Sequence, residues 1–71
     1  MKPLPYREVK RKLEAAGFAE ASQSGSHVKF AKTTSEGTRT ATVTKHREVA
    51  AGTLRSILRQ AGLSESEFEA L

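Results

Sequence analysis

The stretch Gly25-Ser26-His27-Val28-Lys29-Phe30 decides how the middle of this chain folds. Successive side chains of a β-strand point to opposite faces, so alternating polar and apolar residues are typical of a half-buried strand. Val28 and Phe30 would then face a core, and His27 and Lys29 would share the solvent face. The pattern predicts a strand over residues 27–32, entered through a turn at Ser24-Gly25.

Two further strands are predicted on either side of this one. Residues 18–23 are a plausible first strand, although they are poor in β-branched residues. Residues 35–37, Ser-Glu-Gly, would close a hairpin into a third strand over 38–44. In this third strand Ala41 and Val43 would point inward, and the alternating threonines would form a solvated face.

Two amphipathic helices flank the predicted strands. Apolar residues recur at helical spacing over residues 5–16, between a proline and a glycine. Ser64 followed by Glu67 is a capping box, which predicts a short C-terminal helical tail. The second helix ends at Gly62 and carries the clearest apolar stripe: Leu54, Ile57, Leu58 and Ala61. The order α-β-β-β-α plus a tail predicts an α+β domain with a three-stranded antiparallel sheet and both helices on one face.

Length and charge narrow the classes of protein further. A chain of 71 residues forms one domain, residues 1–71, and without cysteine it has no disulfide framework and no thiolate zinc site. Residues 1–62 hold twelve Lys and Arg against five Glu, a net charge of +7 that attracts polyanions. No apolar run approaches the roughly 20 residues of a membrane span, and the start is too short and too proline-rich for a signal peptide. We therefore expect a soluble cytoplasmic protein.

The predicted solvent face of the central strand suits phosphodiester chemistry. A histidine both takes and gives protons near neutrality, and RNA supplies its own nucleophile in the 2′-hydroxyl. His27 would transfer a proton, as general base or general acid, and Lys29 would stabilise charge on the phosphate. The chain has no Asp, and its Glu residues are scattered along the sequence with no cluster outside the tail, so a two-metal nuclease is disfavoured. We expect neither a metal nor a cofactor.

Two blocks of the chain resemble a known family. The first is Gly25-Ser26-His27 leading through Lys29 to Phe30, and the second runs from Val43 to His46 and on through residues 52–63, Gly-Thr-Leu-Arg-Ser-Ile-Leu-Arg-Gln-Ala-Gly-Leu. Both are similar to the HicA-type (YcfA-like) mRNA interferase toxins of bacterial and archaeal toxin–antitoxin systems. The resemblance implies a fold of the double-stranded-RNA-binding-domain type, metal-independent cleavage of mRNA, His27 as the catalytic residue and a HicB-type antitoxin as partner.

Five residues near His27 are candidate RNA contacts, and most have a structural alternative. Lys29 would contact phosphate or protect the sheet against aggregation. Gly25 and Ser26 would contact RNA or only build the turn. His46, next to Lys45 at the end of the third strand, would contact the RNA backbone, act as a second acid or lie in a solvated loop. Two rival functions use the same basic surface: a non-catalytic RNA-binding module, and a protein-interaction domain that docks an acidic partner.

Overall fold

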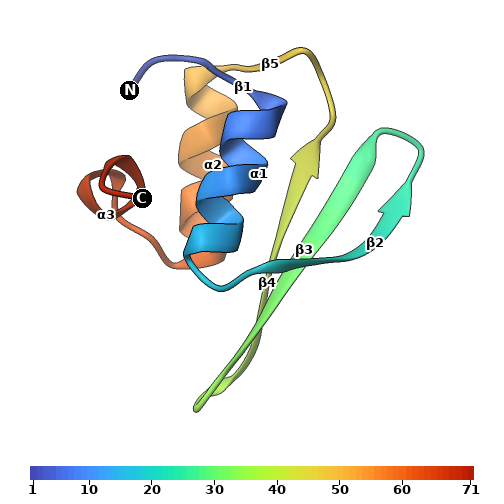
Figure 1. The fold of residues 1–71 in the computed structure, drawn as a ribbon, viewed down its shortest axis with the longest axis vertical. Coiled ribbons are helices and arrows are strands. Elements are labelled where there is room, and N and C mark those ends of the chain that lie inside the picture. The colour runs from blue at the N-terminus through green and yellow to red at the C-terminus, as the bar shows by residue number, and fades with distance from the viewer.

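The computed structural model describes all residues, 1–71, and confirms the predicted α+β layout (Figure 1). A three-stranded antiparallel sheet has the order β2-β3-β4, and β1 pairs with β5 in a second, two-stranded sheet. The two long helices pack on one face of the larger sheet. The elements are β1 (Leu4–Pro5), α1 (Tyr6–Ala15), β2 (Ala19–Ser24), β3 (His27–Thr34), β4 (Gly37–Thr44), β5 (Glu48–Val49), α2 (Ala51–Ala61) and α3 (Glu65–Glu69).

A single apolar core lies between the helices and the sheet. Every buried side chain is apolar, and no polar or charged side chain is buried. With neither a disulfide nor a buried ion pair in the chain, hydrophobic burial holds this domain together. The core consists of Val9 and Leu13 of α1, Val28 and Phe30 of β3, Ala41 and Val43 of β4, Leu54, Ile57, Leu58 and Ala61 of α2, and Phe18, Val49 and Phe68.

The end of α2 shows how its sequence sets its length. Gly62 adopts a left-handed backbone with φ of 73°, and its N–H donates to the main-chain oxygen of Arg59 at 3.3 Å. The next N–H, of Leu63, donates to Leu58 at 3.0 Å, which completes a Schellman motif. A Cβ at position 62 would lie 2.7 Å from the guanidinium of Arg39. Glycine is therefore favoured by the left-handed backbone, whereas the guanidinium is the far end of a flexible side chain that can move aside.

The two-stranded sheet is the one part of the fold that the sequence did not predict. Leu4 pairs with Val49 and Pro5 with Glu48, which ties the entry of α1 to the entry of α2. Strands of two residues are too short to show an alternating pattern. The larger strands also differ slightly from the prediction, since β3 continues to Thr34 and β4 begins at Gly37.

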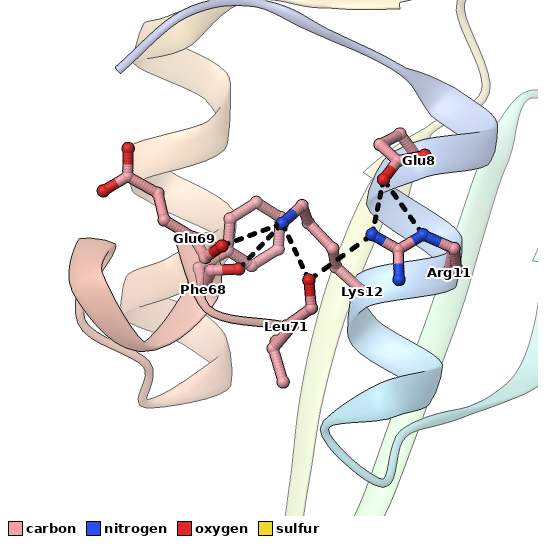
Figure 2. Close-up of polar contacts among 6 residues, drawn as sticks. All are labelled: Glu8, Arg11, Lys12, Phe68, Glu69 and Leu71. Atoms are coloured by element: carbon pink, nitrogen blue, oxygen red, sulfur yellow. Dashed lines mark hydrogen bonds and ion pairs between the residues drawn. The ribbon is translucent and has the colours of Figure 1, made fainter.

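The short helix α3 docks on α1 through a lysine (Figure 2). Lys12 donates from Nζ to the main-chain oxygens of Phe68 at 3.1 Å, Leu71 at 3.2 Å and Glu69 at 3.4 Å. These oxygens lie at the end of α3 and just beyond it, where the partial negative charge of a helix end favours a cation. The oxygen of Phe68 also accepts from the N–H of Leu71 at 3.2 Å, and that of Leu71 from Arg11 Nη2 at 3.4 Å. The ring of Phe68 is buried, and Lys12 Nζ lies 5.3 Å from its centroid. The predicted tail is thus a docked part of the domain.

Candidate functional site

The solvent face of β3 carries His27 and Lys29, as the alternation predicts. Both side chains are exposed, whereas Val28 and Phe30 are only 1% and 0% exposed. Lys29 makes neither an ion pair nor a hydrogen bond within the protein. The central strand therefore presents a titratable base and an unpaired cation side by side, with no helix above them.

Hydroxyl side chains surround His27 on this face. In the register of the sheet, His27 lies opposite Thr44 of β4 and Ser24 of β2. Directly opposite residues of antiparallel strands share a face, with Cβ atoms about 4.5–5.5 Å apart. Lys29 has corresponding neighbours in Thr42 and Ser22. These hydroxyl groups are the part of the site that reasoning from the sequence did not single out, although the alternation over residues 38–44 already placed the threonines on one solvated face.

Gly25 and Ser26 form the two-residue turn that delivers His27 to the start of β3. Gly25 has a φ of 59°, which strains any residue with a side chain. Gln23 Nε2 donates to the main-chain oxygen of Gly25 at 2.9 Å, and the N–H of Lys45 donates to that of Ser26 at 2.6 Å. The turn is therefore tied both to β2 and to the segment that follows β4. These contacts give both turn residues a structural role, and contact with RNA stays a prediction for them.

Lys45 does not join His27 on the open face. Its Nζ lies 5.8 Å from the centroid of the Tyr6 ring, at the start of α1 and thus on the helix side of the sheet. The Tyr6 hydroxyl donates to Glu20 Oε1 at 3.3 Å, and Lys10 Nζ lies 3.2 Å from the same oxygen. Desolvation, followed by the Glu20 carboxylate, raises the pKa of Tyr6. The structure separates the two predicted lysines onto opposite faces.

His46 lies close to the His27 end of the sheet. Its N–H donates to the main-chain oxygen of Thr44 at 2.8 Å, and Thr44 is the residue opposite His27. His46 is exposed at a small hollow of about 170 Å³ between the end of β4 and the start of α2. The hollow is lined by Thr44, His46, Glu48, Val49, Ala50 and Thr53. Thr44 is thus opposite one of the two histidines of the chain and two positions before the other.

The largest hollow of the molecule lies elsewhere. It has a volume of about 510 Å³ and is located beside α3, away from both histidines. Its walls are formed by Met1, Lys2, Leu4, Lys12, Phe68 and Glu69. Neither histidine lines this hollow, and its Lys12 is engaged with the end of α3. No three His, Cys, Asp or Glu side chains anywhere in the protein lie close enough together to hold a metal ion.

Comparison with known proteins identifies the family. The family model described as the HicA toxin of bacterial toxin–antitoxin systems matches residues 6–63, which include every strand of the larger sheet and both long helices. No curated protein matches the sequence. None of the helices combines the length and apolar character needed to cross a membrane. The match spans most of the chain and contains both histidines, so this chain belongs to the HicA toxin family and is a toxin that pairs with an antitoxin.

Proposed function

We propose that this toxin is a metal-independent endoribonuclease that cleaves mRNA, with His27 as its catalytic residue. The observation that carries the proposal is the position of His27 and Lys29 on the uncovered face of the central strand, next to each other and free of intramolecular polar partners. An RNA strand can reach both side chains there without any movement of the helices. Membership of a toxin family supports a reaction that damages an essential polymer.

The proposed chemistry uses the nucleophile that RNA brings with it. The 2′-oxygen attacks the adjacent phosphorus, the bond from phosphorus to the 5′-oxygen breaks, and the products are a 2′,3′-cyclic phosphate and a 5′-hydroxyl. His27 either takes the proton from the 2′-hydroxyl or gives a proton to the departing 5′-oxygen. Lys29 lies two residues along the same face, where its charge stabilises the phosphorane. His46, beyond Thr44, is the candidate for the other proton transfer.

The proposed partner is a HicB-type antitoxin that covers the open face of the sheet. A protein that buries His27 excludes RNA from the same surface, and an acidic contact surface would associate rapidly with this basic domain. The site of action is then the cytoplasm, where mRNA and the antitoxin are both present.

Replacing His27 by alanine tests the catalytic assignment. The side chain is exposed and its loss removes no buried contact, so the free energy of unfolding should change by no more than about 0.5 kcal/mol. Cleavage of RNA should fall by roughly 10²–10⁴-fold, the usual contribution of a general acid or base. His46→Ala should also reduce cleavage if His46 makes the other proton transfer, and Lys2→Ala is the control that should leave cleavage unchanged, because Lys2 is exposed beside α3, away from both histidines. A folded His27→Ala protein that cleaves at the wild-type rate would refute the assignment. If the wild-type protein binds RNA but yields no product, the chain is a non-catalytic RNA-binding module instead.

A further inference from the structure

The open face of β4 carries a row of threonines beside the proposed catalytic residue. Thr40, Thr42 and Thr44 alternate with the buried Ala41 and Val43, so their side chains point away from the core. In the register of the sheet they lie opposite Ala31, Lys29 and His27 respectively. Successive members of the row are about 6.8 Å apart along the strand. We call these three residues the threonine row.

The hydroxyl groups of the threonine row are free to bind a ligand. None of the three donates or accepts a hydrogen bond within the protein, and the one polar contact at Thr42 uses its main-chain N–H, which donates to Gln60 Oε1 at 3.0 Å. Thr34, at the far hairpin, differs because its hydroxyl bonds to the main-chain oxygen of Gly37 at 2.8 Å. A hydroxyl group can both donate and accept, which suits the 2′-hydroxyl and the phosphate oxygens of RNA.

No aromatic side chain is available on the open face to stack against bases. The chain has three Phe and one Tyr and no Trp, and the three Phe are buried in the core. The Tyr is Tyr6, which contacts Lys45 and Glu20 on the helix side. Sheet surfaces that read single-stranded RNA by its bases rely on such stacking. This face has only hydroxyl groups and Lys29 with which to bind RNA beside His27.

The charge distribution on this face is compatible with a polyanion. Glu20, the only acidic residue of β2, lies opposite Phe30 and therefore points to the helix side, where it meets Lys10. The other positions around His27 carry Ser, Thr or Lys. No carboxylate on these strands repels a phosphate that approaches His27.

We propose that the threonine row binds the sugar–phosphate backbone of the RNA substrate and selects ribose through its 2′-hydroxyl groups, without reading the bases. The proposal rests on the proposed ribonuclease function and adds to it how the substrate is held. Phosphate contact by Lys29 supplies affinity for any nucleic acid, whereas hydrogen bonds to 2′-hydroxyls distinguish RNA from DNA. Substrates of different base sequence should therefore bind this face with similar affinity.

The test compares two pairs of threonines in a background that leaves RNA intact. Thr40→Val and Thr42→Val are introduced together into the His27→Ala protein, because valine keeps the branched shape and strand preference of threonine and removes only the hydroxyl. The control combines Thr33→Val with Thr38→Val, a cross-strand pair at the other end of the same face, with Thr38 about 13 Å from Thr42 along β4. Fluorescence anisotropy then gives the Kd for an unstructured RNA oligonucleotide and for the DNA of the same sequence.

Loss of the two hydroxyl groups should weaken RNA binding by about tenfold, leave DNA binding nearly unchanged and bring the RNA-to-DNA affinity ratio toward one. The control pair should leave both values unchanged. The proposal for the threonine row is wrong if the Thr40/Thr42 variant binds RNA as before, or if its affinities for RNA and DNA fall equally. The ribonuclease assignment is judged separately: it stands if the same substitutions in a protein with His27 intact leave cleavage normal. If the Thr40/Thr42 variant binds RNA more weakly and the His27→Ala protein still cleaves at the wild-type rate, the threonine row is supported and the catalytic assignment of His27 is wrong.

Discussion

The two faces of the same sheet use their cations in opposite ways. On the helix side, Lys32 Nζ donates to the main-chain oxygen of Ala16 at 2.6 Å, and Arg39 donates to that of Gln60 at 3.2 Å. Each of these side chains satisfies the end of a long helix, where carbonyl groups lack partners. On the open face, Lys29 has no partner at all. Charge on one face stabilises the fold, and charge on the other is free for a ligand.

This difference shows that net charge alone does not locate a binding surface. Much of the positive charge that predicted a polyanion partner is engaged within the protein: Lys10 with Glu20, Arg11 with Glu8, Lys12 with the end of α3, Lys32 and Arg39 with helix ends, and Lys45 with the Tyr6 ring. What distinguishes the open face is that Lys29, which has no internal partner, shares one face of β3 with the exposed His27.

Substituting two neighbouring residues of β3, Phe30 and Lys29, should give the largest difference between the two faces in stability and in RNA binding. Phe30 is completely buried, and Phe30→Ala should lower the free energy of unfolding by about 3–5 kcal/mol, a large part of the stability of a small domain. Lys29→Ala should change it by less than about 0.5 kcal/mol and instead weaken RNA binding and reduce its dependence on salt. Urea unfolding and RNA binding at two salt concentrations measure both. A destabilised Lys29→Ala protein would contradict this division between the faces.

Removing the lysine that holds α3 should have the next largest effect. Lys12→Met keeps most of the side-chain length but removes the ammonium donor from the main-chain oxygens of Phe68, Glu69 and Leu71, at a cost of about 1.5 kcal/mol. The oxygen of Phe68 keeps the N–H of Leu71 as donor, and that of Leu71 keeps Arg11 Nη2. Amide exchange should speed up in α3 more than in α2. Arg59→Met, on the exposed surface of α2, is the control and should change little. Equal exchange in α3 of both variants would show that burial of Phe68 alone holds this helix.

The fold was predictable from the sequence because its main signals are periodic. Alternating polar and apolar residues in β3 and β4, and apolar residues at helical spacing in α2, predict which side chains are buried. The structure places Val28, Phe30, Ala41 and Val43 in the core, as predicted. The site was predictable in part. The alternation of side chains along a strand puts His27 and Lys29 on one face. Lys45 lies beyond the end of β4, where the direction of its side chain depends on contact with the Tyr6 ring. Such contacts between distant segments, like the pairing of β1 with β5, leave no periodic pattern in the sequence.

The cap of α3 should give a smaller effect that depends on pH. Ser64→Ala removes the side chain that accepts from the N–H of Glu67 at 3.1 Å and should cost about 1 kcal/mol. Hydrogen bonds from Ser64, first from its main-chain N–H and then from its side chain, lower the pKa of Glu67 from its ordinary value. A carboxyl with a lowered folded pKa stabilises the protein above its unfolded pKa, and that stabilisation is lost as pH falls through the folded value. Thermal unfolding from pH 7 to pH 3 should show the loss in the wild type, and Glu67→Gln should reduce it.

The smallest expected effect is that of removing divalent metal ions, which should leave cleavage unchanged. Carboxylates are absent from the positions around His27, and Glu20, the acidic residue nearest in the sheet register, lies on the other face with Lys10. If His27 and Lys29 on the open face carry out the reaction, an excess of EDTA should not alter the rate of RNA cleavage. Because the 2′-hydroxyl is the nucleophile, the product should carry a 2′,3′-cyclic phosphate and an all-DNA oligonucleotide should stay intact. Cleavage lost on chelation and restored by Mg²⁺ would contradict the proposed mechanism, which uses His27 and Lys29 and no metal ion.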